Sequence, residues 1–342
     1  MIIMLTTSRG IEDIVEKEIE EKVGAFKNRK DLVNMPGRVL VELNEESVSK
    51  LLALRSVFHI VRFITSFKIE SSKEGLRTIY NTLRSLNLSD VIEGKKKFRV
   101  TSERSGNHEF TSLDIQRVAG QAIVDSCGLK VDLENFDLEF TVDVINDKCI
   151  VGSRLTRELL HKRGYRIFNH PAALKPVLAY AMVRLANLRE GEMLVDPMCG
   201  GGTIPIEAAY SYNGKIKIYG FDKVLKYVIG AKMNAEKAGV NNYIVFEKLD
   251  CALLSKRLSS IDAIVTNPPY GVRMTPITGI ERLYRVLVSE AYKALSNNGK
   301  LIVITLKFGL MKKILKNLGF MVLEERATTH GGLHPHIIVA KK

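Results

Sequence analysis

Two short motifs in the second half of the chain carry residue types that can do chemistry. The first, at residues 196–203, reads DPMCGGGT, and the second, at residues 267–271, reads NPPYG. The glycines of the first motif let the backbone approach a ligand closely and turn sharply into a helix. The consecutive prolines of the second motif impose a rigid, extended turn. The first motif therefore suits a ligand-binding loop, and the second suits a loop that holds its side chains in a fixed direction.

Acidic residues end the next two predicted strands at places that suit a nucleoside. Asp222 stands twenty residues after Gly202, where a carboxylate can accept hydrogen bonds from both hydroxyls of a ribose. Asp250 follows the third strand and is placed for an adenine amino group. Pro205 stands where a nicotinamide-binding loop would have its third glycine, and the GK[ST] ending of a phosphate-binding loop is absent. The series therefore predicts a nucleoside cofactor.

The second motif has the chemistry to bind an amino group. Two acceptors, the Asn267 side-chain oxygen and the Pro268 carbonyl oxygen, are predicted to point the same way because the turn is rigid. Acceptors held together in this way can bind an exocyclic NH2 group, and Tyr270 offers a face on which a flat base can stack. Such a loop can also simply cap a strand. Its place beside a cofactor loop on the same sheet edge favours the functional interpretation.

The elements that must position these motifs alternate regularly from residue 171 onward. Alternating strands and helices indicate an α/β fold with a doubly wound, mostly parallel sheet and helices on both faces. Ligands of such sheets lie at the carboxyl ends of the strands, where both motifs stand. A helix is predicted over 172–188, directly before the first strand. The last two strands, over 320–327 and 335–340, have no helix between them, so the final strand is predicted to run antiparallel.

The preceding half of the chain is predicted to hold two smaller α+β domains. A helix over 8–24 and strands over 38–43 and 59–67 suit a ferredoxin-like domain. Further strands and helices follow. The predicted divisions are a ferredoxin-like domain at 1–67, a second domain at 68–156, a short basic linker at 157–169 and a Rossmann-like domain at 170–342.

Composition and charge limit the classes of partner. The 342 residues have a formal net charge of +13, with 51 Lys and Arg against 38 Asp and Glu. The excess lies in residues 151–342, and such a field suits a polyanion such as nucleic acid. No apolar run reaches the length of a membrane span, and the four cysteines include no CxxC pair. We therefore expect a cytoplasmic protein without a membrane anchor, disulfide scaffold or metal centre.

Together the two motifs resemble those of class I S-adenosylmethionine-dependent methyltransferases that modify exocyclic amino groups. This resemblance implies S-adenosyl-L-methionine as the cofactor. The family usually has serine where this chain has Gly201, but both flanking glycines are kept. Residues 170–176, HPAALKP, resemble the family's helix that closes over the cofactor. The residues implied to bind the cofactor are Asp196, Gly200, Gly202, Thr203, Asp222, Asp250 and Asn267, and those implied to act on the target amine are Asn267, Pro268, Pro269 and Tyr270.

The first half of the chain resembles a THUMP domain preceded by a ferredoxin-like domain. The resemblance lies in residues 98–100, 110–112, 132–133, 137–138 and 151–152. It implies an RNA-modifying enzyme whose THUMP domain binds the acceptor end of tRNA. The implied activity is tRNA guanine-N2 methylation, nearest to the group acting at position 6. The candidate RNA-binding residues are Lys95, Lys96, Lys97, Arg99, Arg163 and Arg273.

Several alternatives stay open at this point. The same chemistry can act on ribosomal RNA or on another position of tRNA. Adenine-N6 methyltransferases of DNA also use NPPY, although no DNA-reading helix-turn-helix is evident. A catalytically silent RNA-binding protein is a different class, which cofactor binding would test. We expect a monomer without an obligate protein partner. His330, His334 and His336 lack a carboxylate or cysteine to complete a metal set, and Cys199 is given no nucleophilic role.

Overall fold

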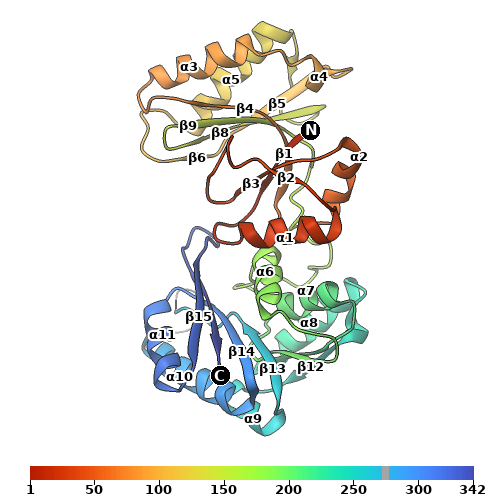
Figure 1. Ribbon diagram of the computed structural model, residues 1–342, viewed down its shortest axis with the longest axis vertical. Helices are drawn as coiled ribbons and strands as arrows, with labels where there is room; N and C mark the ends of the chain where they lie inside the picture. Colours follow the sequence, from red (N-terminus) through yellow and green to blue (C-terminus); the bar gives the residue numbers. More distant parts are fainter. Residues whose placement is uncertain (272–276) are drawn as a thin grey trace. The chain divides into compact units, whose positions relative to one another are not determined.

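The chain forms two compact units (Figure 1). A computed structural model describes residues 1–271 and 277–342. The first unit comprises residues 1–6, 19–53 and 58–159, and the second comprises residues 7–18, 54–57 and 160–342. Within the described ranges no helix is long and apolar enough to cross a membrane.

A nine-stranded sheet forms the body of the first unit. Its order is β2-β3-β1-β4-β9-β8-β5-β7, with β6 paired to β8 outside this path. Helices α3 and α5 lie side by side along one face of the sheet (Figure 1). The strands are β1 Ile2–Thr6, β2 Lys27–Asn28, β3 Arg38–Glu42, β4 His59–Lys68, β5 Lys97–Thr101, β6 Arg104–Ser105, β7 Lys130–Val131, β8 Leu138–Ile145 and β9 Lys148–Arg154. The helical segments of residues 1–159 are α1 Glu12–Lys22, α2 Glu45–Val48, η1 Ser49–Ala53, α3 Glu74–Ser85, α4 Ser89–Ile92 and α5 Ser112–Cys127.

Strand β4 joins the two parts of this sheet. Its first residues pair antiparallel with β1, and from Val61 to Lys68 it pairs antiparallel with β9. Strand β1 was not predicted, because its run IIMLT lacks the alternation of a half-buried strand. Residues 1–67 and 68–156 thus contribute to one continuous sheet. The division between residues 67 and 68 into two domains stays a prediction.

Helix α5 shows how local sequence and core packing agree in the first unit. Thr111 caps the helix in a capping box with Asp114, and Gly128 ends it with a φ of 66°. Its buried face packs on a core in which the rings of Phe98 and Phe140 meet edge to face, 5.9 Å apart. The capping residues and the buried face thus define the same helix, Ser112–Cys127.

A seven-stranded sheet forms the centre of the second unit, in the order β12-β11-β10-β13-β14-β16-β15. The pairs from β12 to β14 are parallel, whereas β16 runs antiparallel to both β14 and β15, which confirms the prediction for the final strand. The strands are β10 Met193–Asp196, β11 Lys217–Asp222, β12 Ile244–Lys248, β13 Ile261–Thr266, β14 Leu295–Thr305, β15 Met321–Ala327 and β16 His336–Lys341. The predicted α/β fold class is therefore confirmed.

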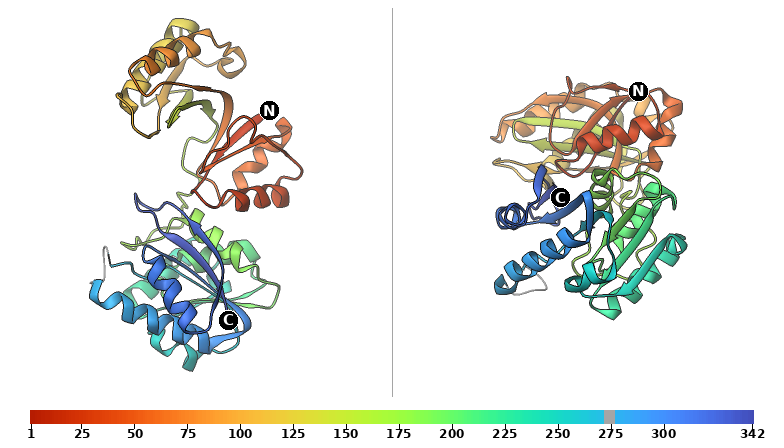
Figure 2. Two further views of the ribbon diagram at one scale, coloured as in Figure 1. Left: turned by 60° about the vertical axis from the view of Figure 1, so that its left-hand side comes forward. Right: turned by 60° about the horizontal axis from the view of Figure 1, so that its bottom comes forward.

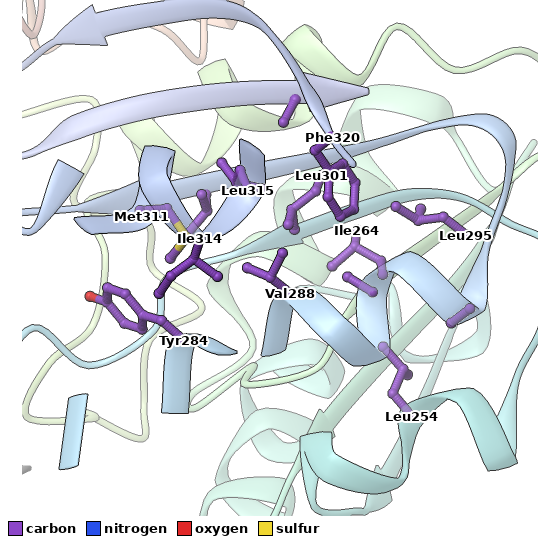
Figure 3. Close-up of a cluster of buried hydrophobic side chains, with 14 of the residues drawn as sticks. Leu254, Ile264, Tyr284, Val288, Leu295, Leu301, Met311, Ile314, Leu315 and Phe320 are labelled. Carbon is purple, nitrogen blue, oxygen red and sulfur yellow. The ribbon is translucent and has the colours of Figure 1, made fainter. Parts of the chain in front are cut away.

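Helices cover both faces of this sheet. Helices α6, α7 and α8 lie on one face, and α10 and α11 lie on the other (Figure 2). Figure 3 shows the core beneath α10 and α11, where Tyr284 and Val288 of α10 lie among aliphatic side chains of β13, β14 and α11. The helical segments are α6 Pro176–Ala186, α7 Thr203–Tyr212, α8 Leu225–Lys237, η2 Asn241–Tyr243, η3 Cys251–Leu253, α9 Leu254–Arg257, α10 Ile277–Ala294 and α11 Phe308–Asn317.

One predicted helix boundary in the second unit is wrong. The helix predicted over 172–188 begins only at Pro176, and residues 170–175 precede it without helix or strand. Lys175 is extended because the residue before a proline is disfavoured in the helical region, and Pro176 suits the first helical turn, where no N–H is needed. Residues 170–175 therefore form a segment without regular secondary structure directly before α6. This segment lies close to both motifs.

Candidate active site

Both motifs line one cavity of about 820 Å³ in the second unit. Asp196 is the last residue of β10 and Asp222 the last of β11, while Asp250 follows β12 and Asn267 follows β13. The cavity therefore lies at the carboxyl ends of four neighbouring parallel strands, as the fold class predicts. Residues 170–174, α10 and the turn between β15 and β16 complete its wall.

The glycine-rich loop needs its glycines for two separate reasons. Gly200 and Gly202 have φ angles of 51° and 79°, in the left-handed region that favours glycine. A Cβ on Gly202 would also lie 3.0 Å from the Cβ of Ala231 on α8 and 3.1 Å from the ring of Phe246 on β12. The loop can therefore pack closely on α8 and β12 and deliver Thr203 as the first residue of α7.

Asp196 is a buried carboxylate at the edge of the cavity. Its side chain is 1% exposed, and its Oδ1 accepts hydrogen bonds from Thr266 Oγ1 at 2.8 Å and from the Met198 N–H at 3.1 Å. Burial raises the pKa of the Asp196 carboxyl to about 7, because removal from water disfavours the charged form. A ligand cation beside this group would favour its ionised form, so the site is suited to an ammonium group.

The other two acids are held by backbone N–H groups. Asp222 accepts from Gly200 at 3.0 Å through Oδ2 and from Val224 at 2.9 Å through Oδ1. Asp250 accepts from Ala252 at 3.0 Å and is exposed. An ionised carboxylate has about four lone-pair sites, so each acid keeps acceptor capacity for a ligand. Asp222 and Asp250 stand at the carboxyl ends of the adjacent strands β11 and β12, where sheets of this kind bind their ligands.

The turn at residues 267–270 is fixed from both sides. Asn267 Nδ2 donates to the Ala172 carbonyl at 3.4 Å, and Tyr284 of α10 donates its hydroxyl to the Pro269 carbonyl at 3.1 Å. The Tyr270 hydroxyl donates to Asn267 Oδ1. Burial raises the pKa of the Tyr270 hydroxyl, so this group stays a donor. The sequence did not predict this bond, which uses one of the two lone pairs of the oxygen expected to accept a target amine.

The candidate RNA-binding residues fall into different environments. Lys95 and Lys96 are exposed before β5 and, among the described residues, form no ion pair. Lys97 pairs with Asp132 at 2.9 Å, and Arg99 pairs with Glu139 at 2.9 Å and lies over the Phe136 ring. These two are held by protein partners. Arg273 lies outside the described residues.

Arg163 is placed differently from the exposed lysines. Its side chain is 11% exposed, and its guanidinium donates to the Arg55 carbonyl at 2.9 Å and lies 3.5 Å from Glu207 of α7. Glu207 is fully buried and also accepts from Arg55 at 2.7 Å and from Tyr165 at 3.0 Å. Arg163 thus belongs to a buried ion cluster within the second unit, which explains its position without an RNA contact.

Several cavity residues were not singled out from the sequence. Three residues of α10 line the cavity: Arg282, Leu283 and Val286. Their amphipathic spacing predicts only a helix that packs on the core, not a ligand site. His330 also lines it, from the turn between β15 and β16, although the sequence raised it only as a metal candidate. Within residues 1–271 and 277–342, no cluster of His, Cys, Asp and Glu side chains is arranged to hold a metal ion.

Comparisons with known proteins agree with this geometry. A family described as "RMKL-like, methyltransferase domain" matches residues 163–336, and the THUMP domain family matches residues 73–154. A tRNA (guanine(6)-N2)-methyltransferase of Archaeoglobus fulgidus is 33% identical over 98% of this chain and 90% of its own length. One of the same name from Thermus thermophilus is 30% identical over 98% of both chains.

A solved structure shares the fold over its whole length. The crystal structure of TrmN from Thermus thermophilus has a TM-score of 0.81 and 29% sequence identity, and the match covers 100% of this chain and 99% of that one. The family matches span both parts of the chain, and the methyltransferase match includes both motifs of the cavity. The predicted resemblance is thereby confirmed: the chain belongs to the family of RMKL-like methyltransferases that carry a THUMP domain.

Proposed function

We propose that this enzyme transfers the methyl group of S-adenosyl-L-methionine to the exocyclic N2 amino group of a guanosine in tRNA, at position 6 of the acceptor stem. The observation that carries the proposal is the shared cavity, in which the Asn267–Tyr270 turn lies with the acids at the ends of β10, β11 and β12. The names of the full-length relatives support tRNA and guanine N2 as the substrate.

The cavity residues fit the cofactor by the chemistry of their donor and acceptor groups. The buried Asp196 carboxylate suits the α-amino group of the methionine part, and Asp222 and Asp250 suit the ribose hydroxyls and the adenine amino group. Gly200 and Thr203 line the cavity and would border the methionine part, while Gly202 does not line it and shapes the loop between them. When bound, the cofactor supplies an electrophilic methyl group on a sulfonium.

The turn at residues 267–270 acts on the target amine. Guanine N2 is a poor nucleophile because its lone pair is delocalised into the ring. Asn267 Oδ1 and the Pro268 carbonyl would accept its two N–H groups and favour a more tetrahedral nitrogen whose lone pair is available for attack, and the proton that the nitrogen loses on methylation would pass to solvent. Asn267 Oδ1 already accepts from the Tyr270 hydroxyl, and its second lone pair remains available to the amine. The Tyr270 ring then stacks on the flipped base, and positioning supplies most of the rate.

Transfer to defined RNAs tests the proposal. Purified enzyme is incubated with labelled S-adenosyl-L-methionine and unmodified tRNA transcripts, the RNA is digested to nucleosides, and the label is mapped by fragment mass. Label as N2-methylguanosine at position 6 is the expected result. The same nucleoside elsewhere in tRNA would support methylation of guanosine N2 but contradict position 6 as its site. Transfer to ribosomal RNA alone would overturn tRNA as the substrate.

Lys95 and Lys96 are proposed to contact the tRNA backbone. The double variant Lys95→Glu/Lys96→Glu should raise KM for tRNA and lower the slope of log affinity against log salt by about 2, since each lost phosphate contact removes about one unit. Affinity for S-adenosylhomocysteine should not change. The control Lys50→Glu/Lys73→Glu makes the same charge change at other exposed lysines of the first unit. An equal rise in KM for both variants would contradict a local contact.

A further inference from the structure

Residues 163–175, which we call the strap, form a wall of the cavity although they contain no helix or strand. The sequence predicted most of this stretch to be a linker. The predicted linker ends at residue 169, and the cavity-lining part of the strap is His170 and residues 172–174, within the stretch 170–176 that resembles the segment closing over the cofactor. Since the strap has no backbone ladder of its own, side chains from elsewhere have to fix its position.

Asn234 supplies the most specific of these contacts. It lies on α8 and is 1% exposed. Its Oδ1 accepts the Phe168 N–H at 2.8 Å, and its Nδ2 donates to the Phe168 carbonyl at 3.0 Å and to the Gly201 carbonyl at 2.9 Å. Both amide protons and the amide oxygen are therefore used. One buried side chain joins the strap to the glycine-rich loop.

Aromatic packing holds the strap on the same helix. A Cβ on Gly230 would lie 2.3 Å from the Phe168 ring, so the missing side chain of this helical glycine makes room for that ring. The His170 ring meets Tyr227 edge to face, with centroids 4.3 Å apart. Tyr227, Gly230 and Asn234 thus present one side of α8 to Phe168 and His170 of the strap.

The far end of the strap reaches the catalytic turn. Arg166 donates to the Thr203 hydroxyl at 2.9 Å and also to the Leu174 carbonyl. The Ala172 carbonyl accepts from Asn267 Nδ2 at 3.4 Å. A shift of the strap would therefore change both the cofactor side of the cavity and the support of Asn267.

From these contacts we infer that Asn234 is a positioning residue for cofactor binding and methyl transfer. It acts through the strap: by holding Phe168 against Gly201, it keeps the cavity wall closed on the cofactor side and keeps Ala172 beside Asn267. This inference rests on the proposed function, because it takes S-adenosyl-L-methionine as the occupant of the cavity.

The test compares Asn234→Ala with Val228→Ala, a change at another buried position of α8 whose apolar side chain cannot hydrogen-bond to the strap. Asn234→Ala should raise the Kd for S-adenosylhomocysteine by about tenfold, since it leaves buried backbone groups without partners. Amide hydrogen exchange over residues 163–175 should become faster, and kcat should fall. Val228→Ala should leave the affinity and the exchange of the strap unchanged, which separates positioning from a general loss of packing.

Gly230→Ala is a second variant, for which the expected effect on the stability of α8 and the expected effect on the strap have opposite signs. Alanine favours a helix interior over glycine, so a purely local effect would stabilise α8. If Gly230 serves the strap, its substitution displaces Phe168 and weakens S-adenosylhomocysteine binding, and the double variant with Asn234→Ala is no weaker than the worse single variant.

Two outcomes would overturn the inference. Unchanged affinity and unchanged exchange in a folded Asn234→Ala would show that Asn234 does not position the strap. Failure of the wild-type enzyme to bind S-adenosylhomocysteine would remove the proposed function and the inference together. If the wild type binds it but methylates no tRNA, the substrate assignment fails, and a weakened Asn234→Ala still supports the positioning role.

Discussion

Replacing Asn267 by alanine is expected to lower kcat by about 10²–10³-fold, because the variant loses the acceptor that we propose to act on the amine in the transition state. The affinity for S-adenosylhomocysteine is expected to stay within about threefold of wild type, since the acids at the ends of β10, β11 and β12 are untouched. Single-turnover methylation of tRNA gives the first quantity, and calorimetry gives the second.

Tyr270→Phe is the matched control for this variant. It removes the hydroxyl that donates to Asn267 Oδ1 but keeps the aromatic face, so turnover should be retained. An equal loss of turnover in Tyr270→Phe would mean that the hydroxyl itself is needed. A parallel loss of cofactor binding in Asn267→Ala would show that Asn267 acts mainly on the cofactor side of the cavity.

Asp196→Asn is expected to stabilise the protein while weakening cofactor binding. The pKa of the Asp196 carboxyl is about 7 in the folded chain, against an ordinary value of 3.8. Between these values the folded state holds a proton that the unfolded state releases, so the contribution of Asp196 to stability is lost as the pH rises toward 7. Asparagine does not ionise, and its Oδ1 can still accept from Thr266 and Met198. At pH 8 the variant should therefore gain up to about 4 kcal/mol in the free energy of unfolding.

Although Asp196→Asn should be more stable, its binding of the cofactor should be weaker. Loss of the charge that we propose to face the α-amino group should raise the Kd for S-adenosylhomocysteine by about tenfold to 100-fold at pH 8. In the wild type, affinity should fall by about tenfold per pH unit below pH 7, because protonation of Asp196 removes the charge that the ligand needs. This pH dependence should be absent from Asp196→Asn. Urea unfolding at pH 5.5 and 8, with calorimetry at both, measures these quantities.

Asp262→Asn serves as the control at the opposite end of the same sheet. Asp262 lies near the start of β13, and its carboxylate accepts from the Met193 N–H at 2.9 Å, away from the residues that line the cavity. Its substitution should leave S-adenosylhomocysteine affinity and the pH dependence unchanged. A stability gain in Asp262→Asn equal to that in Asp196→Asn would contradict the assignment of the effect to the buried carboxyl.

The sequence predicted the parts of the site whose chemistry is tied to strand ends. Asp196, Asp222 and Asn267 follow from the strand-helix alternation, because parallel strands bring their carboxyl ends to one edge. The sequence singled out residues 170–176 but not the contacts that hold the strap, because these partners are distant in sequence: Phe168 depends on Gly230 and Asn234, and neither residue type signals such a contact. The hydrogen bond from Tyr270 to Asn267 was missed because a four-residue turn allows several side-chain conformations.

The count of Lys and Arg residues did not distinguish exposed basic side chains from buried ones. Lys95 and Lys96 are exposed, as a basic surface requires, whereas Arg163 lies in the buried cluster around Glu207. A count of basic residues cannot separate these cases, because the buried carboxylate that pairs with Arg163 lies more than forty residues away along the chain. Glu207 also lies in a helix of otherwise apolar pattern, where nothing local indicates its partners.

Strand β4 also determines where the chain can be divided into fragments. The matched THUMP stretch, residues 73–154, begins after β4, yet β4 lies between β1 and β9 in the sheet. A fragment cut at residue 73 would leave the backbone N–H and C=O groups of Lys148–Arg154 along an open edge, the kind of surface that pairs with other chains and aggregates. The THUMP stretch therefore depends on β4 to cover this edge, and we expect a fragment that includes β4 to associate less than one that begins at residue 73.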